Sequence, residues 1–167
     1  SKSLDVSTFH DAAHAYLDQI ENNQSFYVPS GIKELDDSID GVGPGEVCII
    51  AGRPNHGKTA IGLQWLSNAS QLGVKCLFVS EEMGAREIGK RRVMSISSLP
   101  HAQAAIPRLR KEINEYHKTA ADVYLVESCG TIDRVEEQID SMCGLYDVGL
   151  VAIDYMQLLT SRAKDRY

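Results

Sequence analysis

One eight-residue stretch constrains this chain more than any other part of its sequence. It follows the phosphate-binding P-loop pattern G-x-x-x-x-G-K-T and consists of Gly52, Arg53, Pro54, Asn55, His56, Gly57, Lys58 and Thr59. Glycines let a backbone turn tightly and direct its N–H groups at an anion. Lys58 can reach the outer phosphates of a nucleotide, and the hydroxyl of Thr59 can complete the coordination shell of Mg²⁺. The pattern predicts a nucleotide-binding site that ends at Ala60.

The residues on either side of the loop support this interpretation. Residues 46–51 form a short apolar run bounded by turn residues, which is typical of a buried strand. Residues 59–69 place apolar side chains at helical spacing. A helix that starts there presents its N-terminus to the phosphates, and its dipole favours their charge. A glycine-rich turn with an incidental lysine is the weaker interpretation in this context.

Composition excludes several classes of protein. The 167 residues suffice for one domain with a core, and no apolar run reaches membrane-spanning length. No signal peptide is visible. The net charge of −6 argues against a surface that coats nucleic acid in general, although a local basic loop remains compatible with it. The four cysteines form no C-x-x-C pair, so we expect reduced thiols in a cytosolic protein, with Cys48 and Cys76 in strands, and no zinc site.

Apolar periodicity predicts that helices and strands alternate along the chain. The expected helices cover residues 8–22, 32–39, 59–69, 85–97, 102–118 and 131–143, with Gly41 as the cap of the second and Thr131 as the cap of the last. The expected strands cover residues 46–51, 75–79, 123–126 and 150–153. This order predicts an α/β fold with a mainly parallel sheet flanked by helices. Such a domain normally continues with more strands, so we expect the fold to be incomplete at its C-terminal end.

Two of the expected strands lead into carboxylates. Glu81 and Glu82 follow the strand at 75–79, and Asp154 follows four apolar residues. Ligands of parallel α/β sheets bind at the carboxyl ends of the strands, which places these acids on the same edge as the P-loop. One glutamate can orient and deprotonate a water that attacks the γ-phosphate, unless both belong to the first turn of the next helix. Asp154 can hold Mg²⁺ directly or through water.

The sequence allows two interpretations for each of three further features: the first helix, a basic cluster and the last segment. The helix over residues 8–22 has one apolar stripe, which packs on its own domain or docks on a neighbouring subunit. The basic cluster at residues 90–92 is expected on a solvated helix face, with phosphate or subunit contact as the alternative. The last segment either begins a DNA-facing loop or forms a disordered tail. Its cations, candidate DNA contacts, are Arg162, Lys164 and Arg166.

Four stretches in combination resemble one known family. Residues 30–46 contain Ser-Gly-Ile, Leu-Asp and Gly-Glu, and residues 51–60 place Arg-Pro inside the P-loop and Gly-Lys-Thr-Ala at its end. Residues 78–83 read Phe-Val-Ser-Glu-Glu-Met, and residues 150–159 contain Ile-Asp-Tyr-Met-Gln-Leu. Together, residues 25–160 resemble the ATPase domain of DnaB-type replicative helicases. That family has an F-S-L-E-M element, so its usual Leu is replaced by Glu81 in this chain.

The resemblance implies a RecA-like P-loop NTPase core and a role for each matching residue. Lys58 and Thr59 match the P-loop lysine and the magnesium-binding hydroxyl. Glu82 matches the catalytic glutamate and, with Lys58, forms the expected catalytic pair. Asp154 matches the second metal-associated carboxylate. Gln157 matches a position common in the family and is a candidate sensor or coupling residue.

The resemblance also implies a function and a domain organisation. Residues 1–24 match the linker helix and its connection, and residues 25–167 match an ATPase domain that lacks its later strands. Such a motor uses ATP and Mg²⁺ to move on single-stranded DNA and unwind duplex. The resemblance favours docking of the first helix on a neighbour in a hexameric ring, with primase and a helicase loader as candidate partners, in the cytoplasm of a bacterium or a phage-infected host. The alternatives are a RecA/RadA- or KaiC-like ATPase and a nucleotide-dependent assembly module.

Overall fold

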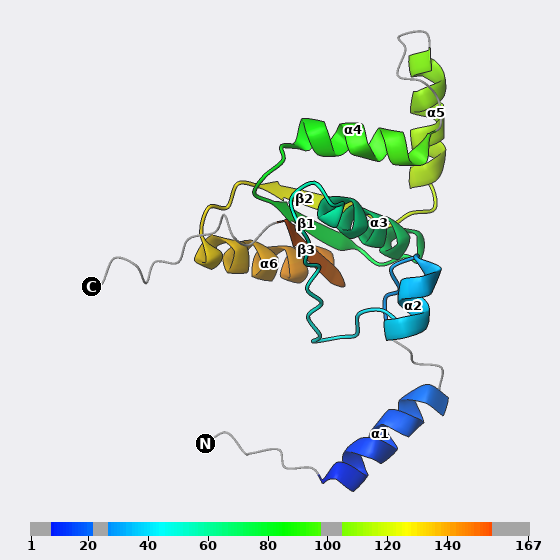
Figure 1. Cartoon of the computed structure of the whole chain (residues 1–167), viewed down its shortest axis with the longest axis vertical. Coiled ribbons are helices and arrows are strands. Elements are labelled where there is room, and N and C mark those ends of the chain that lie inside the picture. The colour runs from blue at the N-terminus through cyan, green and yellow to red at the C-terminus, as the bar shows by residue number, and fades with distance from the viewer. Residues whose placement is uncertain (1–7, 22–26, 98–104, 155–167) are drawn as a thin grey trace, which may run out of the picture.

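A computed structural model of the chain describes residues 8–21, 27–97 and 105–154, and its elements follow the predicted order closely (Figure 1). The described elements are α1 (Phe9–Glu21), α2 (Lys33–Ile39), α3 (Lys58–Gln71), β1 (Cys76–Ser80), α4 (Ala85–Ile96), α5 (Ile106–His117), β2 (Val123–Glu127), α6 (Ile132–Tyr146) and β3 (Leu150–Asp154). The six predicted helices and three of the four predicted strands are confirmed. The hydroxyl of Thr131 caps α6 by accepting a hydrogen bond from the backbone N–H of Arg134, as expected.

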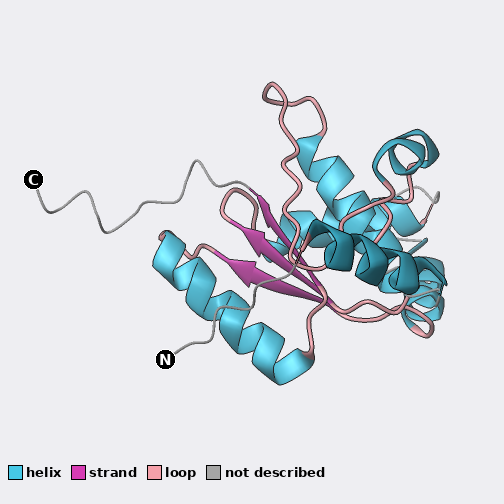
Figure 2. Ribbon diagram, turned by 90° about the horizontal axis from the view of Figure 1, so that it is seen from below, coloured by secondary structure: helices cyan, strands magenta, loops and turns pink. Residues whose placement is uncertain are grey.

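The three strands form one parallel sheet in the order β2-β1-β3, which Figure 2 shows as three arrows side by side. All five residues of β1 are buried, because the strand pairs on both edges and its side chains are covered on both faces of the sheet. The register pairs Ser80 with Glu127 on one side and with Asp154 on the other. The carboxyl ends of the three strands therefore meet at one edge of the sheet, as the sequence predicted.

Helices cover both faces of the sheet. Strand alternation sends Cys76 and Phe78 to the face under α3, where they pack with Leu66 and Ala69. Leu77 and Val79 point to the opposite face, where they pack with Val135 of α6 and with Cys129. Burial raises the pKa of the Cys76 thiol to about 11, so this side chain stays protonated and packs as a small apolar group.

The predicted strand over residues 46–51 is wrong. The segment has no regular secondary structure, and Val47 and Ile49 are 87% and 84% exposed. Cys48, expected in a strand, is exposed as well. A strand forms only when its backbone N–H and C=O groups find a neighbouring strand. Within the described residues β3 pairs only with β1, and nothing pairs with residues 46–51.

Residues 28–42, which precede the P-loop, form hydrogen bonds with α3 and with one another. Val28 and Val42 form an antiparallel bridge, and the indole N–H of Trp65 donates to the carbonyl of Val28 at 2.9 Å. A Cβ on Gly41 would lie 2.4 Å from that carbonyl, so only glycine fits there at its φ of +122°. The cap of α2 is Asp40, in the left-handed region, and not Gly41 as expected.

Asp36 holds the turn that leads into α2. One of its carboxylate oxygens accepts hydrogen bonds from the hydroxyl and backbone N–H of Ser30, at 2.6 and 2.7 Å. The other accepts from the backbone N–H of Gly31 at 2.9 Å. The hydrogen bond from the Ser30 hydroxyl is the main cause that lowers the pKa of Asp36.

Helix α1 stands apart from the sheet and its covering helices in Figure 1. Phe9, Tyr16 and Leu17 belong to its apolar stripe and are exposed, Phe9 at 98%. Among the described residues nothing covers these three side chains. None of the described helices is long and apolar enough to span a membrane.

Two matched truncations test the burial pattern. We expect Leu77→Ala to lower the free energy of unfolding by about 2–5 kcal/mol, because Leu77 is fully buried in the face under α6. Ile49→Ala is expected to change it by less than about 0.5 kcal/mol, because the side chain is already in water. Chemical denaturation of the 167-residue chain measures both. A comparable loss in the two variants would contradict the described placement of residues 46–51.

A second prediction concerns acid stability. Because the folded-state pKa of Asp36 lies below its unfolded value, near 3.9, its stabilising effect is present above that value and is lost as pH falls through the folded pKa. We therefore expect the wild type to lose more stability than Asp36→Asn between about pH 5 and pH 2. Denaturation at several pH values measures the difference. The control is Asp37→Asn, which removes an exposed carboxylate that pairs with Lys33 on the same helix and keeps the hydrogen bonds of Asp36, so the acid-dependent loss caused by Asp36 should persist.

Candidate nucleotide-binding and catalytic site

The P-loop has a backbone suited to an anion. Asn55 and Gly57 have positive φ angles of +62° and +84°, and His56 lies between them with its N–H donating to the carbonyl of Arg53 at 3.3 Å. Alternation of this kind turns successive N–H groups toward one side of a loop. Helix α3 begins at Lys58, and the N–H groups of a first helical turn have no acceptor within their own helix. Loop and helix together can therefore hold a phosphate.

The Lys58 side chain already lies along this loop. Its ammonium donates to the backbone carbonyl of Arg53 at 3.2 Å, so it spans the turn that it belongs to. The imidazole Nδ1 of His56 lies 2.8 Å from the carbonyl of Pro54 and stiffens the same turn. A phosphate oxygen can replace the Arg53 carbonyl as the hydrogen-bond partner of Lys58, because the charged ammonium binds a charged acceptor more strongly.

Thr59 and Asp154 meet, although they are 95 positions apart. The hydroxyl of Thr59, in the first turn of α3, donates to the Asp154 carboxylate at 2.6 Å. Asp154 is the last residue of β3 and is 8% exposed, so its carboxylate is held in place. A hydroxyl and a carboxylate are hard oxygen donors of the kind that Mg²⁺ prefers. The pair fits a magnesium ion held by Thr59 directly and by Asp154 directly or through water.

The two glutamates after β1 have different surroundings. The Glu81 carboxylate accepts hydrogen bonds from the backbone N–H groups of Cys129 and Gly130, at 2.7 and 3.0 Å. Glu82 is exposed at the same edge of the sheet as Asp154. Both glutamates precede α4, which begins at Ala85, so neither belongs to its first turn. Among the described residues, Glu82 accepts no hydrogen bond, whereas Glu81 accepts two from backbone N–H groups, and the catalytic role of Glu82 stays a prediction.

The sequence predicted a solvated helix face for the basic cluster at residues 90–92, and this prediction is wrong for Arg92. The guanidinium of Arg92 lies 4.2 Å from the ring centre of Tyr116 and donates to the hydroxyl of Ser67. Its Nη2 atom is buried without a hydrogen-bond partner among the described residues. Arg92 therefore ties α4 to α3 and α5, whereas Arg91 pairs on the surface with Glu87 at 3.1 Å.

One carboxylate at this edge was not predicted from the sequence. Glu127 ends β2, one residue beyond the predicted strand, and accepts a hydrogen bond from the backbone N–H of Ala85 at the start of α4. A carboxylate is favoured there by the dipole of α4. The rule that singled out Glu81, Glu82 and Asp154, an acid at the end of a strand, also finds Glu127.

Some predicted site residues lie outside the described residues. They are Gln157, Arg162, Lys164 and Arg166. Their predicted roles stay predictions.

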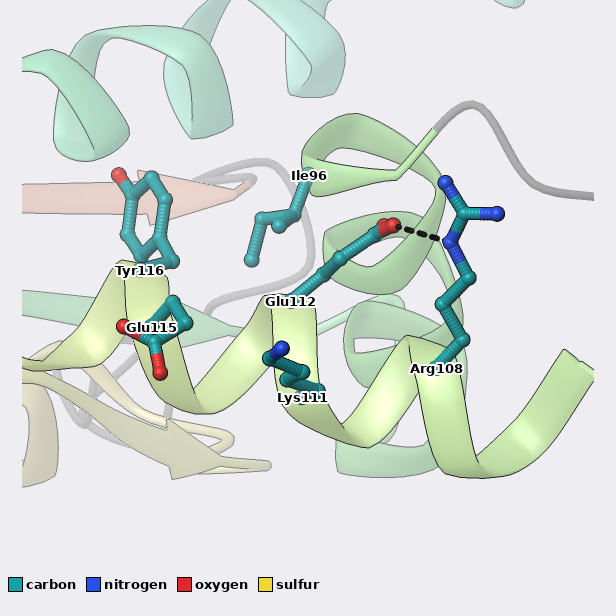
Figure 3. A pocket seen from close by; sticks show the side chains of 6 residues that line it. All are labelled: Ile96, Arg108, Lys111, Glu112, Glu115 and Tyr116. Atoms are coloured by element: carbon teal, nitrogen blue, oxygen red, sulfur yellow. Dashed lines mark ion pairs between the residues drawn. The ribbon is translucent and has the colours of Figure 1, made fainter.

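A pocket of about 570 Å³ is lined by residues of α4 and α5 (Figure 3). Its lining residues are Ile96, Arg108, Lys111, Glu112, Glu115 and Tyr116. Arg108 and Glu112 form an ion pair of 3.4 Å along its wall. None of the predicted site residues lines this pocket, so it is distinct from the candidate nucleotide site.

The fold and the site define the class of this protein. A parallel sheet, a P-loop that leads into a helix, and acids at the carboxyl ends of adjacent strands are the parts of a RecA-like P-loop ATPase domain. The chain belongs to the DnaB-like helicase C-terminal domain family, whose model matches residues 27–167.

Two curated relatives are described as the replicative DNA helicase DnaB. A replicative DNA helicase DnaB of Mycoplasma genitalium is 31% identical over 142 residues, which are 79% of this chain and 30% of that protein. One of Leifsonia xyli subsp. xyli is 30% identical over 149 residues, 80% of this chain and 31% of that protein. The chain thus spans about a third of the length of the curated relatives it matches. These matches do not favour the RecA/RadA- or KaiC-like alternative.

Solved structures confirm the predicted fold. One structure of an ATPase domain superposes with a TM-score of 0.73 at 25% identity, over 93% of this chain and 60% of that chain. A DnaB-like replicative helicase, described with its interactions with primase, superposes with a TM-score of 0.72 at 24% identity, over 93% of this chain and 40% of that chain. The second likeness is one of fold alone.

The Thr59–Asp154 pair generates a prediction about metal-dependent binding. We expect Thr59→Val to weaken the affinity for a fluorescent ATP analogue at least about tenfold in Mg²⁺, because the metal loses a ligand. The affinity in EDTA should stay close to that of the wild type. Titrations under both conditions measure the difference. Thr119→Val, an exposed hydroxyl at the end of α5, is the control, and an equal loss in Mg²⁺ and in EDTA would contradict the metal role.

Proposed function

We propose that this chain is the nucleotide-binding part of a replicative DNA helicase motor, which hydrolyses ATP to move on single-stranded DNA and unwind duplex. The observation that carries the proposal is the contact of Thr59 with Asp154 at 2.6 Å, directly beside the P-loop. It joins the two elements that such a motor needs for one metal–nucleotide site. The relatives described as replicative DNA helicases support the proposal that the bound nucleotide drives a helicase.

Each residue of the site has a task in this mechanism. The loop amides and Lys58 bind the phosphates, and Thr59 and Asp154 hold the metal ion. When bound, Mg²⁺ neutralises charge on the phosphates. Glu82 orients the attacking water and takes its proton. A bound nucleotide would still lack an arginine from a neighbouring subunit, which in such enzymes supplies on the order of 10³–10⁵ in rate.

The exposed stripe of α1 supports a proposal about assembly. Phe9, Tyr16 and Leu17 are large apolar side chains without cover among the described residues. We assign residues 1–24 to a linker that docks on a second copy, and residues 25–167 to the ATPase domain. A hexameric ring in the cytoplasm is the proposed assembly. Single-stranded DNA, primase and a loader are its proposed partners, and one solved neighbour is described with primase.

Hydrolysis by the full-length helicase polypeptide tests the proposal. We expect single-stranded DNA to stimulate ATP hydrolysis, and Glu82→Gln to lower kcat by about 10²–10⁴-fold while ATP binding persists, because an amide cannot accept the proton of the water. Glu137→Gln, an exposed carboxylate on α6, is the matched control. Hydrolysis that ignores DNA, or full activity of Glu82→Gln, would contradict the proposed motor or its proposed base.

A further inference from the structure

At the ends of β1 and β2, the carboxylate beside each strand accepts hydrogen bonds from the segment that follows the other strand. Glu81, directly after β1, accepts hydrogen bonds from the loop that follows β2, at Cys129 and Gly130. Glu127, the last residue of β2, accepts a hydrogen bond from the N–H of Ala85, at the end of the turn that follows β1. Each strand thus holds the loop of its neighbour, and Glu82 lies between these two attachments.

The loop after β2 is shaped to receive the Glu81 carboxylate. Ser128 and Gly130 have positive φ angles of +54° and +73°, and conformations of this kind turn successive N–H groups toward one anion. The N–H of Ser128 donates to the carbonyl of Ser80 at 3.0 Å, which fixes the start of the loop against β1. Cys129 is buried, and its thiol has a raised pKa, mainly through burial and next through the charge of Glu81.

The turn that carries Glu82 is restrained along its whole length. The N–H of Glu81 donates to the carbonyl of Asp154 at 2.7 Å. The hydroxyl of Ser80 donates to the carbonyl of Met83 at 2.7 Å and accepts from its N–H at 3.1 Å, and Met83 is buried. Glu82 is thus an exposed residue between two anchored neighbours, Glu81 and Met83.

We propose that Glu81 is a positioning residue: by binding the amides of Cys129 and Gly130, it fixes the direction in which Glu82 presents its carboxylate to the nucleotide. The proposal rests on the proposed function. The corresponding position of the resembling F-S-L-E-M element is Leu, which accepts no hydrogen bond. The attachment is therefore a property of this sequence and not of the motif.

A positioning role differs measurably from a merely structural one. Within the described residues, no hydrogen bond or ion pair joins the Glu81 side chain to the P-loop or to Thr59. Loss of its carboxylate should therefore slow the chemical step and leave nucleotide affinity alone. A general loosening of the fold would instead weaken ATP binding and hydrolysis together.

The test compares Glu81→Leu, Glu81→Gln, Glu82→Gln and the control Glu137→Gln in the full-length polypeptide. We expect Glu81→Leu to lower kcat about ten- to hundredfold, because a misplaced catalytic group is costly, while the dissociation constant for an ATP analogue with Mg²⁺ stays within about twofold. Glu81→Gln should fall between it and the wild type, because the amide oxygen still accepts one of the two hydrogen bonds. Hydrogen exchange of the Cys129 and Gly130 amides should be slowest in the wild type, faster in Glu81→Gln and fastest in Glu81→Leu.

The outcomes separate this proposal from the function on which it rests. If Glu82→Gln hydrolyses ATP like the wild type, the proposed base fails, and the positioning role falls with it. If Glu82→Gln is inactive but Glu81→Leu and Glu81→Gln keep the wild-type kcat, the positioning role alone is overturned. If Glu81→Leu does not fold, the kcat and affinity of Glu81→Gln decide, and a parallel loss of both overturns the proposal.

Discussion

A hydrogen bond of 2.6 Å between Thr59 and Asp154 joins the beginning of the α3 helix to the end of the β3 strand. The two residues are 95 positions apart, so their contact requires the register in which β3 pairs with the fully buried β1. A slip of one residue would turn Asp154 to the other face of the sheet. The chemistry of the site therefore depends on apolar packing on both faces of β1.

The same register gathers the acids of the site. Ser80 lies between Glu127 and Asp154 in one row across the sheet, and Glu81 and Glu82 come directly after it. Carboxylates placed so close together need separate partners, and the structure provides them. Asp154 has the Thr59 hydroxyl, Glu81 and Glu127 have backbone N–H groups, and Glu82 is exposed. One edge of the sheet therefore holds four acids in four different surroundings.

Local patterns predicted most of the fold, because the period of a helix or strand is written in neighbouring residues. The strand at residues 46–51 was wrong because pairing depends on a neighbour that no local pattern contains. The contact of Arg92 with the Tyr116 ring was not predicted for a similar reason: the charge of Arg92 suggested a side chain in solvent, and its partner lies on another helix. Motif and strand ends were enough to predict that Thr59 of the P-loop and Asp154 lie together, as the structure shows, and to place Glu82 at the same edge of the sheet. The partners of Glu81 were not, since they lie 48 and 49 positions away.

The most direct test of the proposed site is a crystal structure of the chain with Mn²⁺ in place of Mg²⁺ and a non-hydrolysable ATP analogue. We expect an anomalous peak about 2.0–2.3 Å from the hydroxyl oxygen of Thr59, with Asp154 bound to it directly or through water. The ammonium of Lys58 should leave the Arg53 carbonyl for a phosphate oxygen. A nucleotide on the P-loop with its metal ion remote from Thr59 and Asp154 would contradict the site as described.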